Sequence, residues 1–207
     1  MTWLSVRGFG GRQSAVLQGV VAVPGDKSIS HRSLMLAALA EGMSSVEGFL
    51  PSGDCLATLE CVRRLGVQVD HRDIGAPTSL TVHGRGLHGL VAPNRPLDCR
   101  RSGTTMRLLS GILAGQPFSS ELTGEPQLLR RPMRRVTEPL RQMGADISDT
   151  DGHGPLVIRG QGRLQSSHHV LPVASAQVKS AILLAGLYAE GPVLSLIHIS
   201  EPTRLRR

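Results

Sequence analysis

The sequence predicts an α/β protein in which one β-α-β-α-β-β unit is repeated with pseudo-threefold symmetry, the third copy being incomplete. Three helix starts share a pattern of hydroxyl residues, then a cation one turn later, then a Leu/Ala-rich segment; the cations are Arg32, Arg107 and Lys179. Glycine-centred segments also recur, since Gly66 and Gly144 are 78 residues apart and Gly84 and Gly160 are 76 apart. This spacing exceeds that of a solenoid repeat and indicates a supersecondary unit.

The first unit begins with a strand that Pro24 and Gly25 bring to an end, because these residues break regular structure. Ser28 and Ser30 are the candidate caps of the helix that follows, and Ser52-Gly53-Asp54 begins the second helix. Alternation of apolar and polar residues identifies the strands. The predicted elements are a strand at 14–23, a helix at 28–41, a strand at 44–49, a helix at 54–65 and strands at 67–71 and 79–83.

The second and third units follow by the same criteria. The second contains a strand at 95–98, a helix at 104–114, a strand at 118–122, a helix at 133–143 and strands at 145–148 and 156–159. The third contains a strand at 168–172, a helix at 175–189 and the beginning of a strand at 192–194. The neighbouring His168 and His169 are expected on opposite faces of their strand and are interpreted as surface histidines.

Composition narrows the class of protein. Hydrophobic residues make up 40% of the 207, enough for a globular core. The formal charge of +7 is scattered and aromatic residues are only 2%, which argues against nucleic-acid binding. Three cysteines without a Cys-x-x-Cys pair argue against a disulfide framework or a zinc site. No apolar stretch approaches the ~20 residues of a membrane helix and residues 1–11 lack a signal-peptide core, so a cytoplasmic protein without a membrane partner is expected.

The start of the first helix has the features of an anion site. Lys27 and Arg32 flank Ser28 near the positive end of the helix dipole, where free N–H groups also favour negative charge. The alternative for this helix start is an ordinary capped helix with two solvated cations. The alternative for the threefold repeat is that it serves packing alone and forms no shared site. Recurrence at three helix starts favours a shared anion site, with the helix N-termini opening on one face.

Four motifs, in order along the chain, resemble the EPSP synthase (3-phosphoshikimate 1-carboxyvinyltransferase) family. They are Lys27-Ser28-Ile29-Ser30-His31-Arg32, Ser102-Gly103-Thr104-Thr105-Met106-Arg107, Thr123-Gly124-Glu125-Pro126 with Arg131-Pro132, and Ala174-Ser175-Ala176-Gln177-Val178-Lys179-Ser180-Ala181. The resemblance runs from about Val16 to Val193. It implies two similar domains, each an inside-out α/β barrel of three such units, with the substrates bound in the cleft between them.

The resemblance also implies a division of the chain. Residues 1–20 form a strand segment that belongs with the second domain, and residues 21–194 form an incomplete first domain. Residues 195–207 match nothing in the family and look like translated read-through. The second domain carries the family's catalytic Asp and further cations, so this chain alone is expected to lack turnover.

Site roles carry over from the family by position. Lys27 contacts both substrates and is the catalytic residue of this half of the site. Ser28 and Arg32 hold shikimate 3-phosphate, and Ser175 binds the phosphate of that substrate.

The remaining roles concern phosphoenolpyruvate. Gly103 offers its backbone to this substrate, and Arg131 pairs with its acidic groups, as a planar guanidinium fork suits carboxylate and phosphate. Gln177 lies between the two ligands. Arg131 in isolation is also consistent with a solvated helix start, and Arg107 either faces ligand or pairs with a carboxylate such as Glu125.

The implied reaction adds the 5-hydroxyl of shikimate 3-phosphate to phosphoenolpyruvate and releases phosphate, in chorismate and aromatic amino acid biosynthesis. The resemblance implies no metal and no organic cofactor, only the two small-molecule substrates as partners, and a monomer when the protein is complete. Clustered cations would act by positioning and electrostatics. One departure is Arg100-Arg101, where the family usually has Gly-Asn or a similar small polar pair.

Two alternatives remain at this level. One is the sister enolpyruvyl transferase that acts on UDP-N-acetylglucosamine, whose first motif resembles Lys-Asn-Ala and which carries a loop Cys near the position of Arg131. This chain has Lys27-Ser28 and no Cys after Cys99. The other is a non-catalytic module that binds phosphorylated ligands.

Overall fold

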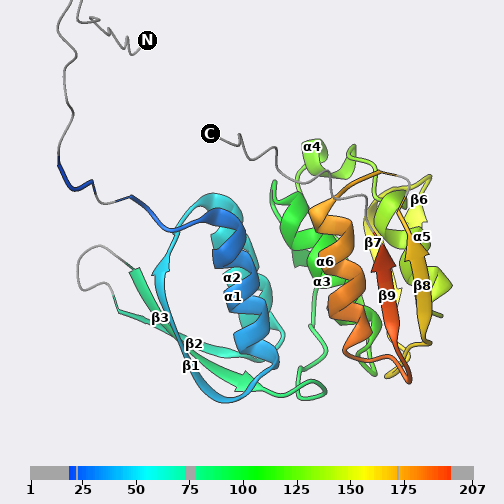
Figure 1. Cartoon of the computed structure of the whole chain (residues 1–207), viewed down its shortest axis with the longest axis horizontal. Helices are drawn as coiled ribbons and strands as arrows, with labels where there is room; N and C mark the ends of the chain where they lie inside the picture. The colour runs from blue at the N-terminus through cyan, green and yellow to red at the C-terminus, as the bar shows by residue number, and fades with distance from the viewer. Residues whose placement is uncertain (1–18, 22, 73–77, 172, 197–207) are drawn as a thin grey trace, which may run out of the picture.

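In the computed structural model the described residues, 19–21, 23–72, 78–171 and 173–196, form two neighbouring lobes (Figure 1). The first lobe contains α1 (Lys27–Leu39), β1 (Glu41–Phe49), α2 (Gly53–Arg64), β2 (Gln68–Arg72) and β3 (Thr78–Arg85). The second contains β4 (Leu97–Asp98), α3 (Gly103–Ala114), β5 (Ser119–Thr123), α4 (Pro126–Leu129), α5 (Arg134–Gln142), β6 (Asp146–Thr150), β7 (His153–Arg159), β8 (Ser167–Val170), α6 (Ala176–Gly186) and β9 (Val193–Leu196).

The sheets follow the predicted unit order. In the first sheet the strand order is β1-β3-β2, and both pairs are antiparallel. In the second the order is β4-β5-β7-β6, in which β4 and β5 are parallel and the other pairs antiparallel. β8 and β9 are parallel, as β4 and β5 are. The α/β class and the repeated unit are therefore confirmed, while the three sheets of the described residues stay separate and close no barrel.

The first pair of repeated glycines has the same backbone role in both units. Gly66 follows α2 with φ +87°, and Gly144 follows α5 with φ +86°. Glycine enters this left-handed region without the Cβ penalty of other residues, so it terminates the helix and turns the chain into the next strand.

The second pair of glycines is explained by a close approach of backbone. A Cβ on Gly84 would lie 2.2 Å from the carbonyl oxygen of Ala40, which follows α1. A Cβ on Gly160 would lie 1.9 Å from the carbonyl oxygen of Gln116, just after α3. The same two carbonyl oxygens accept backbone hydrogen bonds, at 2.9 and 3.1 Å, from the glycines two positions later. The predicted repeat thus extends to individual hydrogen bonds.

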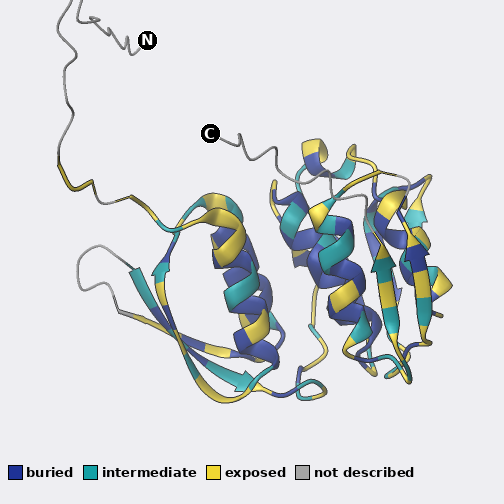
Figure 2. Ribbon diagram, in the orientation of Figure 1, coloured by how far each residue is buried: buried dark blue, intermediate teal, exposed yellow. Residues whose placement is uncertain are grey.

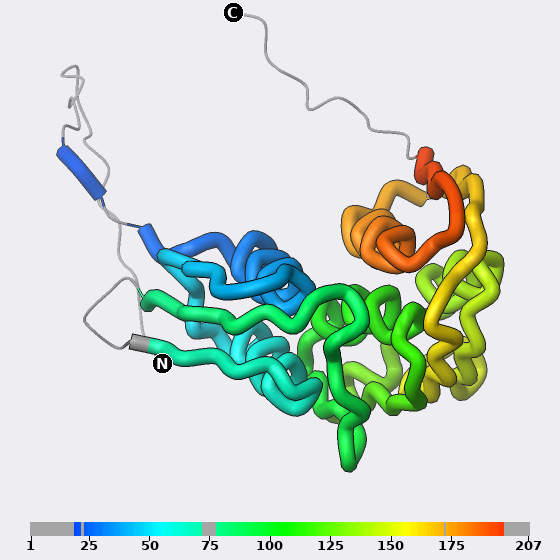
Figure 3. The backbone as a smooth tube through the Cα atoms, turned by 90° about the horizontal axis from the view of Figure 1, so that it is seen from below, coloured from blue at the N-terminus to red at the C-terminus, as the bar shows by residue number. Residues whose placement is uncertain are grey.

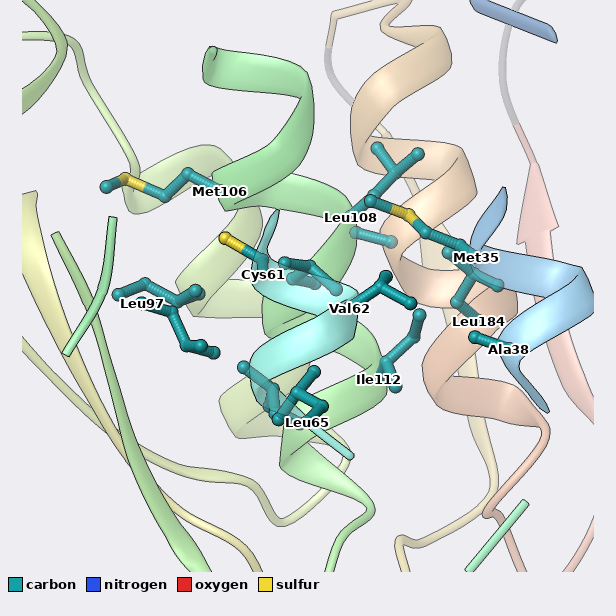
Figure 4. Close-up of a cluster of buried hydrophobic side chains, with 14 of the residues drawn as sticks. Met35, Ala38, Cys61, Val62, Leu65, Leu97, Met106, Leu108, Ile112 and Leu184 are labelled. Atoms are coloured by element: carbon teal, nitrogen blue, oxygen red, sulfur yellow. The ribbon is translucent and has the colours of Figure 1, made fainter. Parts of the chain in front are cut away.

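A single hydrophobic core joins the two lobes. Met35 of α1, Val62 of α2, Ile112 of α3 and Leu184 of α6 point toward one another in Figure 4 and belong to one buried cluster. Figure 2 shows the buried residues on the faces where these helices meet. Full burial of such a side chain contributes about 1.5–3 kcal/mol, so the shared core holds the four helices together.

The first helices of the units pack unequally. α3 and α6 lie side by side (Figures 1 and 3), and a Cβ on Gly111 would lie 2.2 Å from the carbonyl oxygen of Ala181. Between α1 and α6 there is a groove of about 340 Å³ instead. Its lining includes Leu36 and Leu183, which are 52% and 47% exposed.

Some expectations need correction or fall outside the described residues. Of the strand predicted at 14–23, residues 14–18 and 22 lie outside the described ranges, and residues 19–21 and 23 form no strand. Val20 and Val21 are exposed, so no burial stabilises an extended pairing there. The helix α4 was not predicted, because its four residues are too few to show a periodicity.

The interpretation of both neighbouring histidines as surface residues is wrong for one of them. His168 is exposed, but His169 on the opposite face of β8 is only 4% exposed, and its Nε2 lies 2.8 Å from Ser167 Oγ. Burial, followed by the charge of His168, lowers the pKa of His169. The alternation predicted both faces correctly but not that one of them is covered.

Candidate active site

The N-terminus of α1 has a different cap from the one predicted. Asp26 is the N-cap, and its Oδ1 accepts a hydrogen bond from the N–H of Ile29 at 2.8 Å. The hydroxyl of Ser30 donates to the Asp26 carbonyl and accepts from the N–H of Leu50. The prediction that Ser28 or Ser30 caps this helix is therefore wrong, because the stronger Asx acceptor precedes them. A carboxylate lies at the positive end of α1.

The two cations of α1 pair with two different helices. Lys27 is exposed and forms an ion pair with Asp54 in the first turn of α2. Arg32 Nη1 donates to the Ser28 carbonyl at 3.1 Å, and its Nη2 donates to Ser180 Oγ of α6 at 2.8 Å. Arg32 thereby connects the first unit to the third.

The N-terminus of α3 is capped by a neutral side chain. Ser102 Oγ accepts a hydrogen bond from the N–H of Thr105 at 3.1 Å. The first N–H groups of the helix precede the capped one and have no acceptor within the helix. A Cβ on Gly103 would lie 2.8 Å from Nη1 of Arg107 and 3.3 Å from Nη1 of Arg131. Two guanidinium groups therefore approach this backbone, and a side chain at position 103 would displace their ends.

The first turn of α6 completes this group of residues. Gln177 Oε1 accepts from Nη1 of Arg107 at 2.7 Å, and its Nε2 donates to Thr104 Oγ1 at 2.9 Å. Nη2 of Arg107 also donates to the Pro132 carbonyl at 3.3 Å. Ser175, two residues before Gln177, is the N-cap of α6. The starts of α3 and α6 are thus joined through an amide and a guanidinium.

Positive charge is concentrated at the α3 start. Burial, then the charges of Arg131 and Arg135, lower the pKa of Arg107. Both hydrogen-bond acceptors described above for Arg107 are neutral groups. Glu125, the alternative partner considered for it, instead accepts from Arg101 Nε at 2.6 Å. The half-buried Arg107 and the exposed Arg131, beside helix N–H groups, form a site for a carboxylate or phosphate.

The structure divides the predicted site residues into two sets. Gly103, Arg131 and Gln177 come together where α3 meets α6, while Lys27, Ser28 and Arg32 share the start of α1, and Ser175 caps α6. Arg107, which the sequence left undecided, lies at the centre of the first set. Asp54 was missed as the partner of Lys27, since its only sequence signal was a helix start.

Other features of the described residues do not indicate a second chemistry. A cavity of about 470 Å³ lies between α5 and β8, lined largely by apolar groups such as Val170 and Leu171, and does not include Gly103. Among the described residues, no cluster of three or more His, Cys, Asp or Glu side chains is arranged to hold a metal ion. No helix in the described ranges is long and apolar enough to cross a membrane.

Comparisons with known proteins agree with this geometry. The family model of EPSP synthase (3-phosphoshikimate 1-carboxyvinyltransferase) matches residues 12–206. A 3-phosphoshikimate 1-carboxyvinyltransferase from Methylococcus capsulatus is 56% identical over 200 residues, which cover 96% of this chain and 43% of that protein. One from Acidithiobacillus ferrooxidans is 53% identical over 195 residues, covering 94% and 43%.

Solved structures extend the likeness to the fold. An EPSP synthase from Acinetobacter baumannii superposes with a TM-score of 0.83 at 50% identity, over 90% of this chain and 41% of that one. The chain therefore spans less than half the length of these relatives. Because the family model covers nearly the whole chain, including all four motifs, the chain belongs to the EPSP synthase family.

Proposed function

We propose that the protein to which this chain contributes transfers the enolpyruvyl group of phosphoenolpyruvate to the 5-hydroxyl of shikimate 3-phosphate, releasing phosphate. The observation that carries the proposal is the pair of guanidinium groups, Arg107 and Arg131, over Gly103 in a chain of this family. The relatives' names favour shikimate 3-phosphate over UDP-N-acetylglucosamine as the acceptor.

Phosphoenolpyruvate fits the start of α3. The N–H of Gly103 and the fork of Arg131 would hold its phosphate and carboxylate, and Arg107 would add charge from one turn inside the helix. Arg107 is oriented before the substrate arrives, because Gln177 Oε1 and the Pro132 carbonyl already accept hydrogen bonds from its guanidinium. Preorganised donors stabilise developing charge without reorganising during the reaction.

Shikimate 3-phosphate fits the starts of α1 and α6. Ser28, Arg32 and Ser175 would bind it, and the bond from Arg32 to Ser180 holds the two helices together at this point. Gln177 would lie between the ligands. Lys27 would contact both substrates as the catalytic residue, exchanging part of its ion pair with Asp54 for their anionic groups.

The division of the chain remains part of the proposal. Residues 21–194 would form the incomplete first domain, residues 1–20 would join the second, and residues 195–207 would form a tail outside it. β9 continues to Leu196, two residues into that predicted tail, and the match to the family model extends through most of it, to residue 206. The complete protein would be a cytoplasmic monomer that binds neither nucleic acid nor membranes and needs no cofactor.

A chimera tests the proposed function directly. Residues 1–196 of this chain would replace the matching part of the Methylococcus capsulatus relative, and the product would be expressed in a strain lacking EPSP synthase. Growth without aromatic supplements is the expected result. Failure to grow with a soluble, folded chimera would contradict the proposal.

Site variants of the chimera sharpen the test. Lys27→Ala and Arg131→Ala should each abolish growth, because each removes a cation that contacts a substrate. Arg163→Ala is the matched control, since its side chain is 76% exposed and pairs only peripherally with Glu190. Unimpaired growth of both site variants would refute the site assignment.

A further inference from the structure

Four buried polar side chains connect α1 to the N-cap of α3. His31 Nδ1 lies 2.6 Å from Thr58 Oγ1, which lies 2.7 Å from Thr105 Oγ1, which in turn donates to Ser102 Oγ at 2.7 Å. All four residues are 0% exposed. The roles proposed above for the site do not involve this chain of hydrogen bonds.

The hydrogen bonds have one consistent direction. Each hydroxyl has a single proton, and Thr105 donates its proton to Ser102 Oγ at 2.7 Å, with the Asp54 carbonyl oxygen as a longer second acceptor at 3.4 Å. Thr58 must then donate to Thr105, so it can only accept from His31. The imidazole is therefore the tautomer with its proton on Nδ1.

The surroundings of His31 keep it neutral. Its Nε2 has no hydrogen-bond partner among the described residues and is buried, so a proton there would be unsatisfied. Burial and the nearby cations Lys27 and Arg32 lower its pKa to about 4, although Asp54 acts in the opposite direction. At neutral pH His31 is therefore neutral, and the hydrogen bonds from His31 to Ser102 keep one direction.

We propose that His31, Thr58 and Thr105 form a positioning relay that holds Ser102, and with it the N–H of Gly103, at a fixed place relative to the cations of α1. The expected effect of the relay on ligand affinity rests on the proposed function, because it assumes that Gly103 binds phosphoenolpyruvate. None of the three residues touches substrate; each acts through the next.

The site needs such a relay because its two halves are on different helices. α1 carries Lys27 and α3 carries Gly103, and apolar packing alone permits small slides between them. Directional hydrogen bonds allow one arrangement, and misplacement by about 1 Å lowers reactivity strongly. A buried hydroxyl that loses its hydrogen-bond partner lowers the stability of the fold. Breaking one bond of the relay would therefore destabilise the core around it.

The test uses the complete 207-residue chain and NMR. The ring nitrogen shifts of His31 report its tautomer, the Gly103 amide reports the α3 start, and titration with phosphoenolpyruvate reports affinity. Thr58→Val removes the central hydroxyl at nearly constant volume, and Thr58→Ser restores it. Thr137→Val is the control, since Thr137 is also 0% exposed and donates to Asp149 at 3.0 Å.

We expect the ring nitrogen shifts of the unmodified chain to show the Nδ1–H tautomer of His31. In Thr58→Val, the Gly103 amide resonance should shift. In the same variant, the dissociation constant for phosphoenolpyruvate should rise about three- to tenfold, as expected for one lost hydrogen bond. Thr58→Ser should recover both values, and Thr137→Val should change neither. An unmoved Gly103 amide in folded Thr58→Val, or an Nε2–H tautomer, overturns the relay. If the unmodified chain binds no phosphoenolpyruvate, the ligand assignment fails, and the tautomer and the amide shift still decide the relay.

Discussion

The starts of α1 and α3 occupy equivalent places in the repeat but differ in charge. At α1, the cations Lys27 and Arg32 lie beside two carboxylates, the cap Asp26 and the partner Asp54. At α3 the cap is the neutral Ser102, and the bonds described for the central cation Arg107 go to neutral acceptors.

This difference indicates how one structural unit supports two binding roles. The α3 start has excess positive charge and helix N–H groups close together, which suits the compact, strongly anionic phosphoenolpyruvate. The α1 start is closer to neutral and offers hydroxyl, ammonium and guanidinium groups, which suits a ligand with hydroxyls and one phosphate. The repeat gives both helix starts the same backbone, and the capping residue, Asp26 or Ser102, sets the charge at each start.

The largest expected effect is at the α3 start. In the chimera, Arg131→Ala should raise KM for phosphoenolpyruvate by about 10- to 100-fold, because it removes a charge-assisted, two-pronged contact. Steady-state kinetics with each substrate varied in turn measure this. An equal rise in KM for shikimate 3-phosphate would show that the two starts do not divide the ligands.

A pH effect tests the connection between the two starts. The pKa of His31 is about 4 in the folded chain and would be near its ordinary 6.5 when unfolded. The folded state therefore disfavours the protonated form, so stability is fully present above pH 6.5 and is lost as the pH falls toward 4. Between pH 7.5 and 5 the expected loss is about 2 kcal/mol.

Urea denaturation at the two pH values, for the unmodified chain and for His31→Gln, measures this contribution. The substitution should remove most of the pH dependence in that interval. The same slope in both proteins would assign the effect to other groups, such as His169.

A third prediction concerns the loop before α3. Arg100 has φ +51°, a left-handed conformation that costs a residue with a Cβ more than it costs glycine. Arg100→Gly should raise the free energy of unfolding by about 0.5–1 kcal/mol after the greater freedom of glycine in the unfolded chain is counted. Thermal or urea unfolding would detect it, and a loss of stability would show that the Arg100 side chain is held by contacts.

The smallest expected effect comes from making the two caps alike. Asp26→Ser gives α1 a neutral cap, so shikimate 3-phosphate should bind about two- to fivefold more tightly at low ionic strength, with helix stability nearly unchanged. Calorimetry at low and high salt separates the charge effect, which salt screens. Unchanged affinity at low salt would show that the Asp26 charge does not reach the ligand.

The sequence by itself determined the repeated unit, the positions of most helices and strands, and the motifs. These features are local: Ser102 and Ser175 directly precede α3 and α6 and cap them, and Gly66 and Gly144 have backbone angles that few other residues adopt. Periodicity also gave the faces of β8, although it did not show that the His169 side is covered.

Only the tertiary structure decided which residues meet. The bond between Arg107 and Gln177 spans 70 positions and that between Arg32 and Ser180 spans 148, so neither partner leaves a signal near the other in the sequence. Capping by Asp26 rather than a serine, the pairing of Lys27 with Asp54 and the burial of His31 likewise depend on competition among neighbours. Local propensities fix the elements, whereas the shared core and the hydrogen bonds between helices set the distances between their ends, and those distances make the site.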